Sequence, residues 1–270
     1  MQSSKKYLNL ACGDHFVTSS EWENADWAPK SRDVKQSDLL KRLPYSDCTF
    51  DLVYSSHFLE HIPLAQVRTF LEECRRVLKT DGVLRLVLPD FENIAREYIR
   101  NIDARNHLLS EFNIVEMIDQ CVRTESGGEL VKWYRKVDNL ELQDYIHRRT
   151  GYINSGRTTG APSKVSRIKK LTVKKVLNKI HLVMVKTVIS LLPTWYKQNH
   201  ISNTATGELH RWVHDFNSLK KILVEAGFRN VSKLDAFKSL YSEFPNIPLD
   251  VDEKGRSRKG LESMYIEAVR

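Results

Sequence analysis

Two short apolar runs, each followed at once by polar residues, most constrain the fold of this chain. Residues 6–10 (KYLNL) lead into 11–14 (ACGD), and residues 50–54 (FDLVY) lead into 55–61 (SSHFLEH). Short apolar runs that end in such loops are typical of buried strands. Because open α/β sheets bind ligands at the carboxyl ends of their strands, we expect a crevice where these two strands end side by side.

The apolar spacing elsewhere predicts alternating strands and helices. A helix follows Pro63 and stops at Asp81-Gly82, and a later helix has Asp215 as its N-cap and Gly227 after its end. Further strands are expected at 22–27, 32–36, 83–88, 228–231 and 264–269. Strands joined by helices imply a parallel sheet, so the fold class is α/β, with a Rossmann-like, seven-stranded, mostly parallel sheet.

The middle of the chain has helical periodicity and carries the excess positive charge. We expect an α/β domain from 1–100 and 208–270, and a helical, basic insertion at 101–207. Two apolar helical stripes precede the basic part: Leu108, Phe112, Val115, Ile118 and Val122, then Leu130, Trp133, Tyr134 and Val137.

Residues 148–207 hold twelve Lys or Arg and no Asp or Glu, although the whole chain has a net charge of only +8. Within this segment, residues 164–192 fit a basic amphipathic helix. Such a helix suits an anionic membrane surface, the phosphates of a nucleotide sugar, a lipid-linked saccharide or RNA, or a solvated cover packed on the domain. We favour the solvated helix that covers the domain, with an additional tendency to bind phosphate groups or a membrane surface. RNA and other nucleic acid are disfavoured, because no aromatic-bearing binding module accompanies the charge.

The cysteine pattern and the apolar runs bear on location. Cys12, Cys48, Cys74 and Cys121 are widely spaced without a C-x-x-C pair, which fits a reducing compartment. The run 182–192 is too short to span a bilayer, and we expect no secretory leader. These features favour a cytoplasmic protein, with peripheral contact at the inner face of the membrane as a further role of the basic segment.

In order along the chain, several motifs resemble those of class I S-adenosylmethionine-dependent methyltransferases, especially small bacterial ones associated with polysaccharide and lipopolysaccharide synthesis. The motifs are LNLACGD (8–14), NAD (24–26), SDL (37–39), FDLVYSSHFLEH (50–61), RVLKTDG (76–82), HRW (210–212), DF (215–216), AGF (226–228) and ESMYIEA (262–268). The resemblance implies methyl transfer from S-adenosyl-L-methionine to a hydroxyl or amine of a small or saccharide-type acceptor.

The resemblance also implies a cofactor site. Asp26 would accept the ribose hydroxyls, and Asp38 would face the adenine amine unless it only caps a short turn. The first loop departs from the family, since Asn9 stands for an acid, Ala11 for the first glycine and His15 for the third. The expected cofactor-binding residues are Asn9, Ala11, Cys12, Gly13, Asp26, Asp38, Leu39 and Ser55.

His57 and His61 would lie beside the transferable methyl group and are the candidate catalytic bases. The alternative is that they only position the loop, and that Glu60 pairs with His61. His57-x-x-Glu60-His61 is also the inverted zinc-protease pattern, but Pro63 indicates that the helix begins after it, so we assign no metal ligands. Some small-RNA and quinone methyltransferases hold a divalent metal with Glu-x-x-Glu-His at this place. Here His57 replaces the first Glu, which leaves that use open.

Other residues are expected near the acceptor. Asp90 ends the fifth strand on the acceptor side, and His210, Trp212 and His214 precede the last helix, with Trp212 more typical of core. The rival hypothesis is a methyltransferase-fold protein that has lost catalysis and serves as a binding or scaffold subunit. This hypothesis is motivated by the first loop, in which Ala11 and His15 stand where the family has glycine. The measured affinity for the cofactor distinguishes the two hypotheses.

Overall fold

A computed structural model of the chain describes residues 5–135, 139–151, 181, 183–185, 187–193, 208–244 and 249–270. Seven strands form one sheet in the order β3-β2-β1-β4-β5-β7-β6. Among these strands only β7 runs antiparallel to its neighbours, so the predicted fold class is confirmed. The strands are β1 (Tyr7–Leu10), β2 (Trp22–Asp26), β3 (Lys35–Gln36), β4 (Phe50–Ser56), β5 (Leu78–Pro89), β6 (Arg229–Leu234) and β7 (Ser263–Val269).

The central pair of the sheet is β1 and β4, in the register Leu10 to Ser55. The next strand outward on the β1 side is β2, and on the β4 side it is β5. The chain therefore leaves β1 in one direction and β4 in the other. Such a reversal of strand order marks the ligand crevice of an open α/β sheet.

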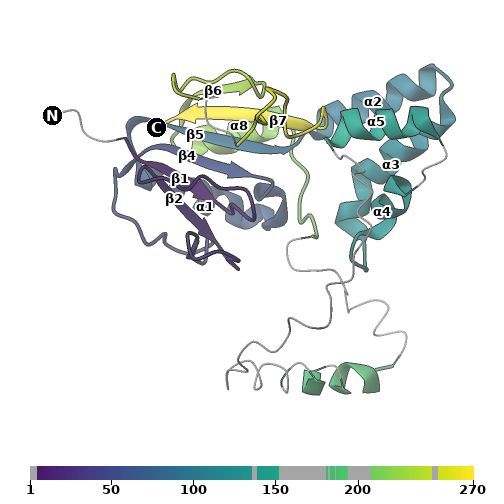
Figure 1. Ribbon diagram of the computed structural model, residues 1–270, viewed down its shortest axis with the longest axis horizontal. Coiled ribbons are helices and arrows are strands. Elements are labelled where there is room, and N and C mark those ends of the chain that lie inside the picture. The colour runs from purple at the N-terminus through teal and green to yellow at the C-terminus, as the bar shows by residue number, and fades with distance from the viewer. Residues whose placement is uncertain are drawn as a thin grey trace.

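Two helices cover one face of the sheet (Figure 1). Helix α1 (Leu64–Val77) buries Val67, Phe70, Leu71, Cys74 and Val77, which recur at intervals of three or four and so share one side of the helix. Helix α8 (Phe216–Glu225) begins at Asp215, whose side chain accepts the N–H groups of Asn217 and Ser218. The buried residues of α1 and α8 form one apolar cluster with the sheet.

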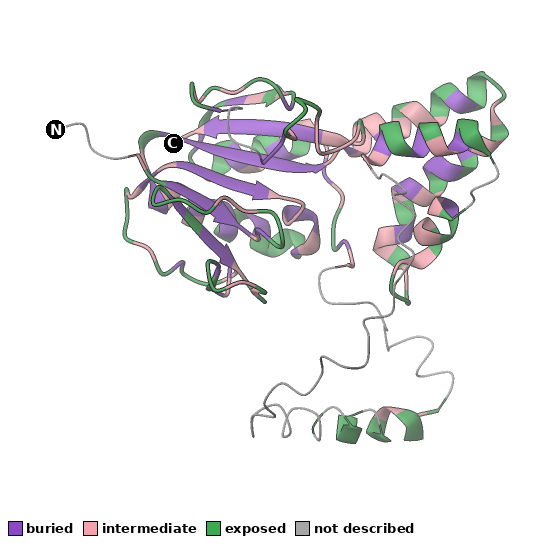
Figure 2. Cartoon of the chain, in the orientation of Figure 1, coloured by how far each residue is buried: buried purple, intermediate pink, exposed green. Residues whose placement is uncertain are grey.

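The opposite face is covered by loop segments after β6. Phe244 and Leu249 pack with Tyr54 of β4 and Val87 of β5. Figure 2 shows that the central strands are buried along most of their length, whereas β3 and most of β6 are not. Burial of these apolar side chains supplies the main stabilisation of the sheet.

A helical lobe lies beyond the carboxyl ends of β4 and β5 (Figure 1). It has its own apolar cluster, which includes Phe112, Trp133, Leu142, Tyr145 and Ile146. The elements of the lobe are α2 (Phe91–Asp103), α3 (His107–Val122), α4 (Gly128–Tyr134) and α5 (Leu140–Thr150).

The C-terminal end of α5 joins the lobe to the sheet. Its carbonyls on Arg148 and Arg149 accept the backbone N–H groups of Leu261 (3.0 Å) and Glu262 (2.9 Å). A Cβ on Gly260 would lie 1.9 Å from the Arg149 carbonyl oxygen, so only glycine allows this approach.

Several sequence expectations are wrong in detail. The helix after Pro63 ends at Val77 rather than at Asp81-Gly82, because Leu78 already pairs with Phe50 in the sheet. Ile118 and Val122 of the expected α3 stripe are exposed. The buried face of α3 is instead partly polar, with Asn113, Glu116 and Asp119 alongside Leu109 and Phe112.

The basic segment is described only in part. Arg149, counted among its cations, is buried and pairs with Glu116 at 2.9 Å. Val183, Met184 and Leu191 are exposed, so in this described stretch the expected packing of a cover helix is not observed. The remaining residues of the segment and Val137 lie outside the described residues.

Candidate active site

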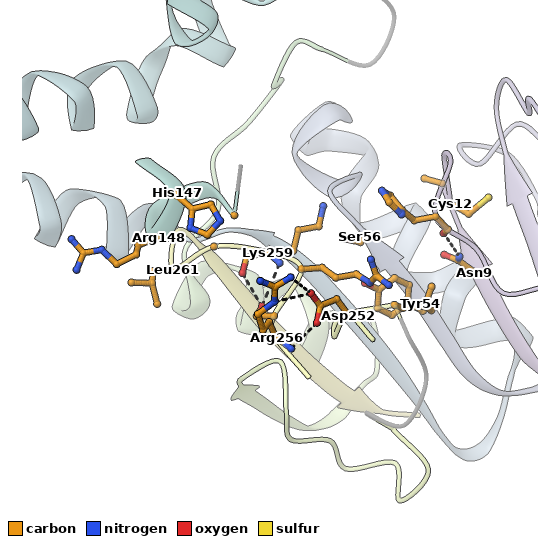
Figure 3. Close-up of a pocket in the computed structure, with 17 residues that line it drawn as sticks. Asn9, Cys12, Tyr54, Ser56, His147, Arg148, Asp252, Arg256, Lys259 and Leu261 are labelled. Atoms are coloured by element: carbon orange, nitrogen blue, oxygen red, sulfur yellow. Dashed lines mark hydrogen bonds and ion pairs between the residues drawn. The ribbon is translucent and has the colours of Figure 1, made fainter. Parts of the chain in front are cut away.

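A cavity of about 620 Å³ opens at the carboxyl ends of β1 and β4 (Figure 3). Asn9, Ala11 and Cys12 line one side, and Tyr54 and Ser56 of β4 lie next to them. The far side is formed by the end of α5 and by the loop 249–261. The predicted crevice therefore exists, and its volume is typical of a small-molecule site.

The loop after β1 turns sharply under this cavity. Ala11 has φ 54° and Gly13 has φ 53°, the left-handed region that favours glycine. The Asn9 side chain donates to the carbonyl of His15 at 3.1 Å and so fixes the loop. Ala11 thus adopts a glycine conformation at the position where the family usually carries glycine.

Cys12 is buried in the same loop. Burial raises the pKa of its thiol to about 12, so the group is a neutral thiol at physiological pH. It contributes an apolar surface to the cavity wall and no charge.

Asp26 ends β2 beside this loop. Its Oδ2 accepts the N–H of Gly13 at 3.0 Å and its Oδ1 accepts the N–H of Ala28 at 2.9 Å. A carboxylate has about four lone-pair sites, so each oxygen retains capacity for a ligand hydroxyl. The geometry fits the expected contact with a ribose.

The other expected cofactor residues lie outside the cavity lining. Asp38 accepts the N–H of Leu40 at 3.1 Å and pairs with Lys41 at 3.2 Å, which is the turn-capping arrangement. The Leu39 side chain is buried in the core. The Ser55 hydroxyl is buried without a hydrogen-bond partner among the described residues. The structure therefore brings Asn9, Ala11 and Cys12 into the cavity lining, whereas Gly13 and Asp26 do not line the cavity and are joined to each other by a hydrogen bond.

The loop after β4 has a bend at His57, whose φ is 50°. His57 Nδ1 lies 3.2 Å from Oε1 of Glu60, and its Nε2 lies 3.3 Å from the Ser263 hydroxyl. Burial lowers the pKa of His57, so its imidazole is neutral at pH 7. His57 follows Ser56, which lines the cavity, but does not line it itself.

Glu60 and His61 belong to the 3-10 helix η1 (Leu59–His61). Burial tends to raise the pKa of Glu60, but its interactions with His57, His61 and His210 dominate and lower it to about 2. The His61 ring lies 4.8 Å from the His210 ring, edge to face. Burial lowers the pKa of His210 to about 4. A buried carboxylate and imidazole rings thus meet at this point, and His61 contacts His210 rather than the cavity.

Two further expectations about the acceptor side change in the structure. Asp90 caps α2 through the N–H of Asn93 (3.3 Å) and pairs with Lys233 (2.5 Å), so its carboxylate is committed to the fold. Trp212 is 44% exposed and is not core.

Positively charged residues form the far wall of the cavity. Arg148, Arg256, Arg258 and Lys259 line it against a single carboxylate, Asp252. Figure 3 shows Arg256 directed at Asp252, which it contacts at 2.8 Å. Arg148 pairs with Asp144 at 3.2 Å.

Lys259 differs from the other cations of this wall. It is half-buried, and among the described residues its Nζ has no ion pair or hydrogen bond. Burial lowers the pKa of its ammonium group. The Lys259 ammonium group therefore lies next to the cavity and can bind an anionic ligand.

This wall was not predicted from the sequence. The available signal was the run KGRSRKG at 254–260, which puts four cations into six residues just before the last strand. Its proximity to the loop after β1 depends on the contact between Gly260 and α5, which no local pattern reveals.

Comparison with known families agrees with the predicted fold class. Residues 11–86, from the loop after β1 into β5, match the family described as a methyltransferase domain. The match spans 76 of the 270 residues and supports a class I methyltransferase. This match supports an enzyme that uses S-adenosylmethionine as the methyl donor.

Solved methyltransferases with weak overall similarity were also found. A methyltransferase from Archaeoglobus fulgidus shares 15% identity over 100% of this chain and 87% of its own, with a TM-score of 0.39. One from Mesorhizobium loti shares 13% identity over 99% and 91%, with a TM-score of 0.39, and one from Aquifex aeolicus shares 12% over 99% and 84%, with a TM-score of 0.38. No curated protein matches the chain. Within the described residues, no helix has the length and apolar character needed to cross a bilayer.

Proposed function

We propose that this methyltransferase acts on a hydroxyl or amine of a saccharide-type acceptor that carries an anionic group such as a phosphate. The observation that supports this most is the single cavity with two unlike walls. One wall is the small-residue loop after β1, and the other holds four cations against one carboxylate. The first suits the cofactor and the second suits an anion.

The cofactor would lie on the β1 side. Ala11 and Cys12 allow close approach of a ligand, and Asp26 offers oxygens to the ribose hydroxyls. The methyl group would then point toward the end of β4, where Ser56 lines the cavity. We assign Asn9, Ala11, Cys12, Gly13 and Asp26 to this site.

The acceptor would lie between β4 and the cationic wall. Ser56 and His147 line this part of the cavity, and the exposed imidazole of His147 can pair with a sugar hydroxyl. The hydroxyls of Tyr54 and Ser257, which also line it, are already bonded to Asp250 and to the Lys259 carbonyl. Lys259 would hold the anionic group, because its charge has no partner among the described residues. Arg258 lies next to it in the same wall.

The reaction would be an in-line displacement. The acceptor oxygen or nitrogen forms a bond to the methyl carbon, the bond from that carbon to sulfur breaks, and the acceptor proton leaves to a base or to water. The enzyme contributes mainly by positioning the two reactants. Neutral His57 could take the proton, although both ring nitrogens already face Glu60 and Ser263; His61 is more remote from the cavity lining.

The test is calorimetry on protein saturated with S-adenosylhomocysteine. We expect a nucleoside-diphosphate sugar to bind and the neutral parent sugar to bind at least about tenfold more weakly, since a hydrogen bond to a charged group contributes about 1.5–3 kcal/mol. Lys259→Gln should remove most of that difference. Lys254→Gln is the matched control, because Lys254 lies on the same loop but outside the cavity lining. Equal binding of both sugars, or the same loss in both variants, would contradict the anionic acceptor.

A peripheral membrane location is a second proposal. Val183, Met184, Val188 and Leu191 are 58%, 59%, 59% and 80% exposed, and residues 148–207 carry twelve cations without an acid. Exposed apolar side chains within a basic segment suit an anionic lipid surface. Co-sedimentation with phosphatidylglycerol vesicles, but not with phosphatidylcholine vesicles, is the expected result. Met184→Glu with Leu191→Glu should abolish it.

A further inference from the structure

Glu60, His61 and His210 converge although they come from distant parts of the chain. Each can direct one ligand atom to a common point, and these atoms lie within 4.8 Å of one another. Glu60 and His61 are held by η1, directly after β4. His210 comes from the segment before α8. Because His210 is remote in sequence, the cluster exists only in the folded chain.

Both imidazoles are oriented by protein groups on their far sides. His61 Nδ1 lies 3.1 Å from the carbonyl oxygen of Leu209, so Nδ1 carries the proton and Nε2 has the lone pair. His210 Nε2 lies 2.9 Å from the side-chain amide of Gln120. The oxygen of that amide can accept the Nε2 proton after a simple flip, which leaves the lone pair on Nδ1. Metal-binding histidines characteristically have their second nitrogen tied in this way.

The Glu60 carboxylate is buried next to imidazoles but receives no hydrogen bond from the described residues. Its side chain is 2% exposed, and both oxygens are buried without a hydrogen bond among the described residues. His57 Nδ1 is near at 3.2 Å but outside hydrogen-bond geometry. The imidazoles compensate the charge in part, but both oxygens keep lone pairs that a cation can take. Nearby His214 is also 2% exposed, with both ring nitrogens unpartnered in the described structure.

From this geometry we infer that Glu60, His61 and His210 bind a divalent transition-metal ion of the zinc class. Two imidazoles and one carboxylate are a common zinc set, with a fourth position left open, and imidazole ligands disfavour magnesium. A cavity of about 20 Å³ borders Glu60 and His210. That is room for one water molecule, which can occupy the fourth position.

The ion would join three elements that the backbone already brings together. The Glu60 carbonyl accepts the N–H groups of Arg211 (2.6 Å) and Trp212 (3.2 Å), and the N–H of His210 donates to the Gln120 carbonyl (2.9 Å). A metal here would therefore clamp η1, the segment before α8 and helix α3 of the lobe. We expect it to stabilise the junction between the lobe and the sheet next to the active-site cavity.

The test begins with the full chain after a chelator has removed any bound metal ions. Titration with Zn²⁺ by calorimetry should show one site per chain, and Zn²⁺ should raise the thermal midpoint while Mg²⁺ does not. Co²⁺ should produce the visible absorption of a low-coordinate nitrogen and oxygen site. No Zn²⁺ binding by the folded wild-type protein would overturn the inference without reference to any variant.

Variants then locate the site. His210→Ala and His61→Ala should abolish the stoichiometric binding, and Gln120→Ala should weaken it about 10- to 100-fold through loss of orientation. His107→Ala is the matched control, because His107 is an exposed histidine on the same helix as Gln120. Circular dichroism checks that each variant is folded. Zn²⁺ binding that survives both His210→Ala and His61→Ala would place the metal elsewhere and contradict the inference.

Discussion

The backbone N–H of Gly13 donates to Oδ2 of Asp26 at 3.0 Å. This bond joins the loop after β1 to the end of β2 and fixes the carboxylate at the edge of the sheet. Since Oδ1 also receives the N–H of Ala28, the group cannot rotate freely. A ribose would thus meet a preorganised acceptor, which reduces the entropy lost on binding.

Ala11→Gly should stabilise the protein. Ala11 has φ 54°, and the left-handed region costs a residue with a Cβ about 1–2 kcal/mol. Glycine removes that cost but makes the unfolded chain more flexible, which opposes it by about 0.4–1 kcal/mol. We therefore expect a net gain of about 0.5–1 kcal/mol in the free energy of unfolding, measured by urea denaturation.

A control for this substitution is Ala104→Gly. Ala104 is an exposed residue with φ −75° at the end of α2, so glycine relieves no strain there and should destabilise. A loss of stability of equal size in both variants would contradict the strained conformation of Ala11.

Arg85→Met should destabilise the fold by about 3–5 kcal/mol, because it leaves buried carboxylates without their counter-charge. Arg85 is fully buried in β5 and contacts Asp250 and Glu267, each at 2.7 Å. Asp250 also accepts the hydroxyl of Tyr54 at 2.5 Å. The network attaches the loop after β6 to the sheet. Thermal and urea unfolding measure the loss.

Arg68→Met provides the comparison for Arg85. Arg68 pairs with Glu72 on the surface of α1, and both side chains are about half exposed. Such pairs contribute about 0–1 kcal/mol. If the two substitutions had similar effects, the buried network would not contribute as described.

Glu73→Gln should change how the free energy of unfolding depends on pH in the acidic range. The hydrogen bond from Arg76 lowers the pKa of Glu73 below its ordinary value of 4.5, and Glu73 also accepts the N–H of Leu43 at 2.8 Å. A lowered pKa stabilises the folded state above the unfolded pKa, and this contribution is lost as the pH falls through the folded pKa. The variant should therefore be less stable than wild type at pH 7, and the difference should shrink as the pH falls below 4.5.

Urea unfolding at several pH values measures this effect. Glu72→Gln is its control, since Glu72 is the exposed neighbour paired with Arg68 and should change stability little. A constant difference between Glu73→Gln and wild type at all pH values would contradict the role of the ionised carboxylate.

Much of the fold was predictable because its signals are local. The strands at 7–10, 22–26, 50–56 and 263–269 follow from short apolar runs, and the N-cap Asp215 and its helix follow from residue type and spacing. The end of α1 was not predictable from the sequence, because Leu78 leaves the helix to pair with Phe50 in the sheet. That pairing is a tertiary contact, which overrides the turn signal at Asp81-Gly82.

The position of the cavity was predictable on the side formed by β1 and β4, where contiguous motifs carry the lining residues. The opposite wall was missed because it depends on the packing of 249–261 against α5. The contact of His61 with the segment of His210 was missed for the same reason, since His61 and Leu209 are 148 positions apart. The orientation of α3 could not be predicted from its apolar residues, because several residues on its buried face are polar.

The most direct test of the account is calorimetric titration of S-adenosylhomocysteine into wild-type protein and into Asp26→Asn. Asp33→Asn is the matched control, because Asp33 is an exposed carboxylate hydrogen-bonded to Ser31. We predict one site per chain, at least about tenfold weaker binding in Asp26→Asn through loss of charged hydrogen bonds, and no change in Asp33→Asn. Absence of binding by the folded wild-type protein would contradict the cofactor site and support a scaffold that has lost catalysis.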